Sequence, residues 1–288
     1  MHLIQTLKRQ RLTPLLKQHP TSSTRPLSSS PARHEPRTPA PQKPHEIDPR
    51  WLTLTKHRIG RCMTFGLKPA QVHEAGEILR LIAKDWRELI AGSEGYLTDA
   101  TRRGLYRQSV AWGEMVWIVV AFANRYAETA RVYFTRNLAV HVDPTHKREW
   151  MDLVSSKGFG IILRSIKIDY KFPMTYPDNV TAYHKLTHDP ESPHSSQYAF
   201  HLQAVILSES RQRPAARVHE DLVTYDYKKG KKTALPPFML EQFKATWALQ
   251  EKAKRFWQQR IVDIESRVRT LEVESWDRAD AVEDMGTA

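Results

Sequence analysis

The segment Tyr126-Ala-Glu128-Thr-Ala-Arg131 places an acid and a base three residues apart, close to a tyrosine. Residues three apart are neighbours on a helix surface, so Glu128 and Arg131 can pair there or reach the same ligand. A pair that caps the helix, or braces it against a sheet, is the simpler interpretation. Contact with a ligand is the alternative.

Other chemically capable residues give weaker patterns. Neither Ser155-Ser156 nor Ser208-Glu-Ser210 lies in a Gly-x-Ser-x-Gly turn, so serine-hydrolase chemistry is not predicted. The histidines lack the fixed spacing of a metal site on one element, and neither a metal nor a cofactor is expected; those considered are His184, His188, His194 and His201.

Three charged segments are interpreted as solvent-exposed surface rather than as catalytic or binding sites. His219-Glu220-Asp221 is interpreted as a solvated acidic strand tail, and Asp169, between two lysines, as one side of a surface salt bridge. Lys228–Lys232, with its central Gly, is typical of an exposed turn, although it could also contact CoA phosphates or RNA.

Composition narrows the class of protein. The 288 residues are 40% hydrophobic, enough for a folded core, and the net charge is +12. Cys62 is the only cysteine, so no intramolecular disulfide can form. No apolar run approaches the roughly 18 residues of a bilayer span. The basic bias suits acidic ligands, while a nucleic-acid partner is expected only within a larger assembly.

The N-terminus predicts import into mitochondria. Residues 1–34 carry six Lys or Arg and no acid, are rich in Ser, and begin with one short amphipathic turn. These are the features of a transit peptide, although an ordinary disordered basic tail shares some of them. Residues 35–50 are then a Pro-rich linker, and the mitochondrial matrix is the expected location.

Hydrophobic periodicity predicts the elements that position these residues. Three- and four-residue spacing indicates helices, and alternation indicates strands, with a slip near Ser165 that suggests a bulge. Residues 51–67 are expected to be an irregular lead-in. We expect helices at 69–91, 124–138 and 240–276, and strands at 106–115, 159–172, 179–186, 198–208 and 216–227. This order favours an α+β domain in which a curved antiparallel sheet wraps one helix.

The same order of motifs resembles the hotdog-fold thioesterase superfamily, of the 4-hydroxybenzoyl-CoA thioesterase type, over residues 105–228. Tyr126–Arg131 resembles the family's helix motif Tyr-x-Glu-x-Ala-Arg. Gly160–Tyr170, Phe172–Val180 and Phe200–Ser208 resemble the strands that follow it. Arg213–Arg217 and Leu235-Pro-Pro-Phe238 are similar to segments of fungal mitochondrial thioesterase-like proteins that share the long C-terminal helix.

The resemblance implies a homodimer that hydrolyses an acyl-CoA to the acid and CoA at the N-terminus of the central helix. The substrate-binding residues it implies are Asn124, Arg125, Tyr126, Glu128 and Arg131. Family members carry an Asp and then Gly-His-Val-Asn-Asn before this helix, whereas this chain has Gly113-Glu114-Met115 followed by apolar residues 116–123.

Three explanations of that departure stay open. The protein has lost catalysis and serves as a structural or binding subunit of a mitochondrial assembly, or a replacement acid acts, for which Glu114 is nearest. Alternatively, the recorded sequence carries a misplaced exon boundary at 116–123. The expected domains are a helical extension at 51–104, the thioesterase-like domain at 105–238, and a C-terminal helix with an acidic tail at 239–288.

Overall fold

A computed structural model describes residues 47–283 of the chain, except 49, 111–118, 157 and 194; at 119–122 the account is limited to the backbone. Six antiparallel strands form one sheet in the order β1-β3-β4-β5-β2, with β6 added to β5. The strands are β1 (Leu105–Ser109), β2 (Phe159–Tyr170), β3 (Asn179–Leu186), β4 (Ala199–Ser208), β5 (Arg213–Asp226) and β6 (Lys231–Lys232).

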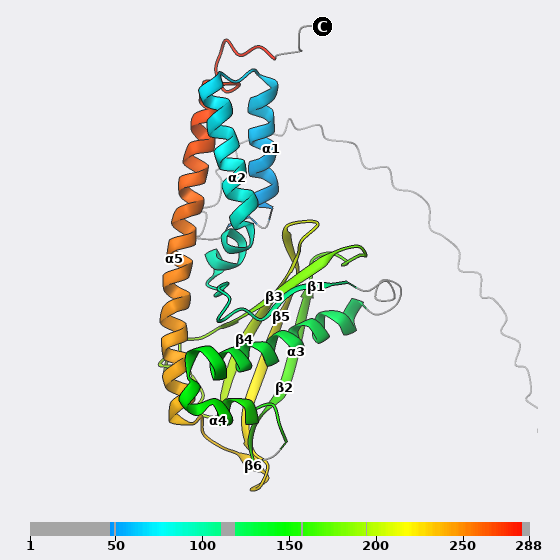
Figure 1. Cartoon of the computed structure of the whole chain (residues 1–288), viewed down its shortest axis with the longest axis vertical. Helices are drawn as coiled ribbons and strands as arrows, with labels where there is room; N and C mark the ends of the chain where they lie inside the picture. Colours follow the sequence, from blue (N-terminus) through cyan, green and yellow to red (C-terminus); the bar gives the residue numbers. More distant parts are fainter. Residues whose placement is uncertain (1–46, 49, 111–118, 157, 194, 284–288) are drawn as a thin grey trace, which may run out of the picture. The chain divides into compact units, whose positions relative to one another are not determined.

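One helix, α3 (Val119–Asn137), lies across the concave face of this sheet (Figure 1). Small side chains allow the close approach: Ala123, Ala127 and Ala130 are fully buried against strand residues such as Ala182 and Ala204. A curved antiparallel sheet wrapped around a central helix is the hotdog arrangement. The predicted α+β class is therefore confirmed.

The strands predicted from the sequence are confirmed except for the first, because β1 ends at Ser109 whereas the prediction ran to residue 115, beyond the start of the segment that is not described. β3 has the predicted bounds, and the pairing of β2 with β5 shifts between Leu163 and Ser165, where the bulge was expected. β5 begins at Arg213 rather than Ala216, so the turn before it is shorter than predicted. Pro214 is tolerated because it lies at the start of the strand.

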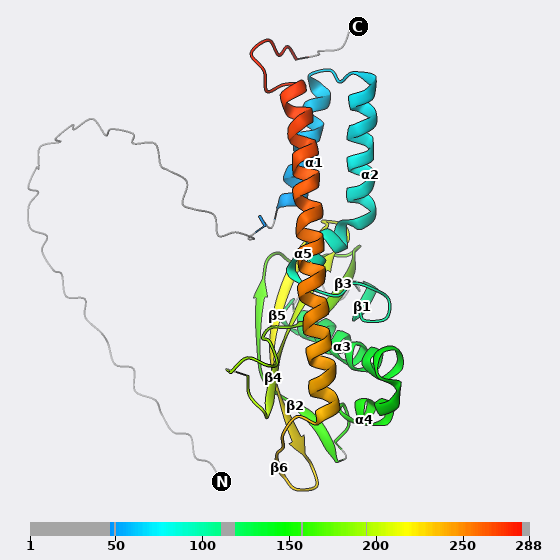
Figure 2. The same ribbon diagram turned by 90° about the vertical axis from the view of Figure 1, so that its left-hand side faces the viewer.

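The other helices are α1 (Trp51–Thr64), α2 (Pro69–Ala91), α4 (Lys147–Asp152) and α5 (Pro237–Glu274), with helical turns η1 (Gly92–Glu94), η3 (Leu138–Val142) and η4 (Pro144–His146). α1, α2 and the second half of α5 pack side by side (Figures 1 and 2). No helix in this described part combines the length and apolarity needed to cross a bilayer.

The irregular lead-in predicted at 51–67 is wrong, because this segment forms α1. Leu52, Thr55, Ile59 and Cys62 recur at three- and four-residue spacing, and all are buried in the core shared with α2 and α5. Gly60 weakens helix propensity, but it lies on the exposed side of α1. Burial of the opposite face thus overrides the local preference.

α5 joins two cores. Its first half places Met239 and Phe243 against the sheet, and its second half places Ile264, Val268 and other apolar residues against α1 and α2. Phe256, by contrast, is 56% exposed on this helix. Gln250, between the halves, exchanges hydrogen bonds with the backbone of Leu186 at 2.9 and 3.1 Å, and so ties α5 to β3.

Candidate functional site

The first half of α3 presents a buried face and a polar face. Ala123 and Tyr126 are buried, the latter only 4% exposed, whereas Asn124 is half-buried and Arg125 and Glu128 are exposed. The structure therefore brings Asn124, Arg125 and Tyr126 together near the start of the helix. Glu114, the candidate acid, lies outside the described residues.

Among the described side chains, the buried ones that cluster with Ala123 and Tyr126 near this end of α3 are apolar. Val110, Met174 and Val180 belong to the same buried cluster as Ala123 and Tyr126. The N-terminus of a helix carries backbone N–H groups without intrahelical partners and the positive end of the helix dipole. An apolar wall beside such donors can accommodate a ligand that joins a hydrocarbon chain to a polarisable carbonyl group.

A groove of about 400 Å³ lies beyond Val110, between the ends of β1 and β3. It contains two carboxylates, and both are engaged. Asp178 accepts hydrogen bonds from Oγ of Ser208 at 2.5 Å and from the backbone N–H of Ser210 at 2.9 Å. Glu209 forms ion pairs with Arg87 and Arg107. These acids therefore hold the strand ends in place.

Farther along α3, Arg131 forms a buried ion pair with Glu220 of β5. Its Nη1 lies 2.5 Å from Oε1 of Glu220, and the other carboxylate oxygen lies 3.2 Å from Nε2 of His184 on β3. The side chains of Glu220 and His184 are fully buried. An unpaired charge is costly in an apolar interior, so Arg131 and Glu220 must stay together. Their ion pair therefore fixes the position of α3 on the sheet.

The sequence-based interpretation of these residues needs two corrections. Arg131 does brace the helix against the sheet, but its partner is Glu220 rather than Glu128, which points to solvent. Glu220 is not part of a solvated strand tail, since it is 1% exposed in the middle of β5. Glu220 is two residues from each of the apolar Val218 and Leu222, and residues two apart lie on the same face of a strand. This spacing was the sequence signal that could have revealed its burial.

The surface interpretations of the other charges agree with the structure. Asp169 lies 3.7 Å from Lys167 and 3.4 Å from His219, in exposed pairs. Lys228–Gly230 lies in the exposed turn between β5 and β6, and the exposed Lys231 and Lys232 form β6. Within the described ranges, no group of three or more His, Cys, Asp or Glu side chains could hold a metal ion.

Comparison with known proteins gives one family match. Residues 110–243 match the model of the Thioesterase-like superfamily. The matched segment includes α3, the strands β2 to β6 and the start of α5, and it leaves out α1, α2 and most of α5. No curated protein sequence matches the chain.

Solved structures resemble about half of the chain. A thioesterase from Thermus thermophilus, complexed with coenzyme A and Zn, is 16% identical; the alignment covers 50% of this chain and 93% of that one, with a TM-score of 0.37. A DHNA-CoA thioesterase from Staphylococcus aureus is 14% identical over 59% and 93%, with a TM-score of 0.35. A hypothetical protein from Aquifex aeolicus is 22% identical over 47% and 95%, with a TM-score of 0.36.

The buried ion pair can be tested by a matched pair of substitutions. Glu220→Gln leaves Arg131 without its counter-charge, so we expect the free energy of unfolding to fall by about 3 kcal/mol. Glu128→Gln, on the exposed side of α3, should change it by less than about 0.5 kcal/mol. Urea unfolding followed by circular dichroism measures both. Equal free energies of unfolding of the two variants would contradict a stabilising role of the Arg131–Glu220 pair.

Proposed function

We propose that the chain binds an acyl-CoA thioester at the N-terminus of α3 and hydrolyses it to the carboxylic acid and CoA. The observation that carries the proposal is the family match, which spans the central helix and the sheet that wraps it. The apolar wall formed by Val110, Met174 and Val180 supports it, because an acyl chain needs such a surface next to the N–H groups of the helix.

The reaction requires two functions from the protein. The N–H groups of the first turn of α3 stabilise the negative charge that develops on the carbonyl oxygen. A carboxylate, for which Glu114 is the candidate, takes a proton from a water molecule while the oxygen of that water attacks the carbonyl carbon. The tetrahedral intermediate then collapses, the carbon–sulfur bond breaks, and the proton passes to the departing thiolate.

A second candidate function is binding without hydrolysis, as a subunit of a larger mitochondrial assembly. The observation that favours it is the composition around the start of α3, where no acid occurs from Met115 to Ala127. Co-purification with a large complex, together with absence of turnover, would favour this function. The sequence of the natural transcript across codons 108–128 would show whether an acid-containing loop is encoded there.

Hydrolysis is tested with hexanoyl-CoA by following release of the free CoA thiol. We expect turnover by the full chain and a loss of at least about 100-fold in Glu114→Gln, as for removal of a general base. The variant should still bind the non-hydrolysable thioether S-hexyl-CoA. If the unaltered chain binds S-hexyl-CoA but does not hydrolyse hexanoyl-CoA, the second candidate function, binding without hydrolysis, is favoured. If it neither binds nor hydrolyses, the proposal is overturned.

We also propose that the protein forms a homodimer through the free edge of β2. Among the described strands, β2 pairs only with β5, and its twelve residues form a long edge on the other side. Ile162, Ile166 and Tyr170 on it are each 36% exposed. Long edges with exposed apolar residues favour pairing with a second strand.

The dimer is tested by light scattering after size-exclusion chromatography. The unaltered chain should have a mass near twice 33.4 kDa. Ile162→Lys places a charge at the edge and should give monomers, whereas Val154→Lys, at an exposed site after α4, should not. A monomeric unaltered protein, or a dimer that survives Ile162→Lys, would count against pairing through β2.

Import into the mitochondrial matrix is proposed from residues 1–34, which lie outside the described part of the chain. A fusion of residues 1–46 to a fluorescent protein should co-localise with mitochondria and be shortened on import. Replacing Arg9, Arg11 and Arg25 by Gln should abolish this, because import signals depend on their positive charges. A cytosolic fusion of the unaltered segment would contradict the location.

A further inference from the structure

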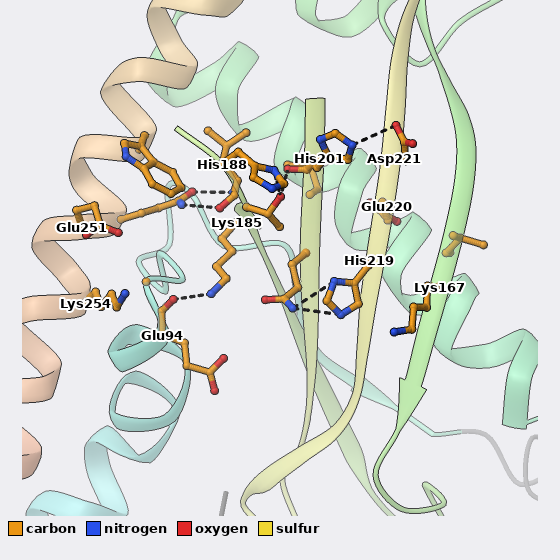
Figure 3. A pocket seen from close by; sticks show the side chains of 18 of the residues that line it. Glu94, Lys167, Lys185, His188, His201, His219, Glu220, Asp221, Glu251 and Lys254 are labelled. Atoms are coloured by element: carbon orange, nitrogen blue, oxygen red, sulfur yellow. Dashed lines mark hydrogen bonds and ion pairs between the residues drawn. The ribbon is translucent and has the colours of Figure 1, made fainter. Parts of the chain in front are cut away.

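The outer face of the sheet, turned away from α3, carries polar side chains in aligned rows. Lys185 of β3 pairs in register with Gln203 of β4, which pairs with His219 of β5, which pairs with Lys167 of β2. Successive strand residues point to opposite faces, so this row is opposite the apolar residues packed under α3. α5 lies beside it (Figure 3), and residues of both line a cavity of about 780 Å³.

Lys185 is the distinctive group in this cavity. Its Nζ donates to the backbone carbonyl oxygen of Glu94 at 2.6 Å and lies 4.6 Å from the ring centre of Tyr96. Among the residues that the structure describes, no carboxylate forms an ion pair with it. An ammonium has three N–H donors, and half-buried charges are normally paired. Lys185 is therefore a half-buried cation without an ion-paired counter-charge among the described residues.

The neighbouring charges do not supply that counter-charge. The carboxylate of Glu94 is already held by both Nη atoms of Arg217, each at 2.5 Å. On α5, Lys254 faces the cavity together with Glu251 (Figure 3). Burial lowers the pKa of Lys185 to about 8. The negative charges of Glu94 and Glu251 oppose this effect, and the positive charges of Arg217 and Lys254 add to it.

A second cavity, of about 480 Å³, adjoins the first. Leu186, His188 and His201 line both. The remainder of the second cavity is largely apolar, with Phe200, Leu235, Leu240 and Phe243 among its lining residues. A cationic anchor and an apolar chamber thus lie next to each other, at the end of β3 where Gln250 fastens α5 to the sheet.

We propose that these joined cavities bind a small amphipathic anion, whose carboxylate or phosphate group accepts hydrogen bonds from Lys185 and whose hydrocarbon part enters the apolar chamber. Cavities of this size suit small organic ligands. The polar row with Lys185 is on the opposite face of the sheet from α3, so this anchor is separate from the proposed thioester site at the start of α3 and does not depend on hydrolysis.

Binding to the full-length protein is measured by isothermal titration calorimetry with four probes. Octanoate and octyl phosphate carry both features, 1-octanol lacks the charge, and acetate lacks the chain. We expect one or both of the amphipathic anions to bind at least tenfold more tightly than octanol and acetate, and the tighter of the two identifies the head group. If neither octanoate nor octyl phosphate binds more tightly than octanol and acetate, or if no probe binds, the proposal is overturned.

Matched variants assign the binding to these residues. Lys185→Gln should weaken octanoate binding about tenfold, as expected for loss of a charge-assisted hydrogen bond, whereas Lys228→Gln, in the exposed turn, should not. Leu240→Asn should weaken it, whereas Leu249→Asn, on the exposed side of α5, should not. Lys185→Arg keeps the charge and should bind. Unchanged affinity in both Lys185→Gln and Leu240→Asn would contradict the site.

The pH dependence separates ligand binding from a purely structural role of Lys185. The ammonium is present below its pKa of about 8 and is lost above it, while the carboxylate of octanoate stays ionised. Octanoate affinity should therefore fall between pH 7 and 9.5 in the unaltered protein. The fall should be absent in Lys185→Gln, and an identical pH profile in that variant would count against Lys185 as the anchor.

Discussion

The contact between Arg131 and Glu220 is the constraint on which the rest of the domain depends. A helix that packs through alanines can slide and rotate, because small apolar side chains give little directional preference. A fully buried carboxylate that must meet one guanidinium removes this freedom. With its middle fixed, α3 presents its first turns at one end of the sheet, next to Val110, Met174 and Val180. The geometry of the proposed thioester site follows from a charge pair about two helical turns away from it.

The period of the strands gives the two faces of the sheet different chemistry. Most inward residues of β3, β4 and β5 are apolar, and the charged or ionisable exceptions, His184 and Glu220, are partners of each other. Outward residues change along the strands, from Tyr183 and Val205 under the helical extension to Lys185 and Gln203 in the open cavity. α5 spans both regions, so the long C-terminal helix is part of the core and also one wall of the outer cavity.

Much of the fold could be predicted from the sequence because its signals are local. The alternation in 179–186 and the helical spacing in 69–91 gave the observed bounds, and the order of elements gave the fold class. α1 was missed because the helix is stabilised by burial of its apolar face against α2 and α5, which its own sequence does not reveal. The sites were harder to predict. The roles of Glu220 and Lys185 depend on neighbours from other strands and helices. Which residues pair across a sheet cannot be predicted from a single segment.

The central claim is that the N-terminus of α3 is where an acyl-CoA binds. Hydrogen–deuterium exchange of the full protein, with and without saturating S-hexyl-CoA, tests it directly. The account predicts slower exchange of the backbone amides of residues 119–126 in the presence of the ligand, because their N–H groups and the wall beside them become covered. Unchanged exchange there, with protection confined to β3 and α5 around the outer cavity, would contradict it.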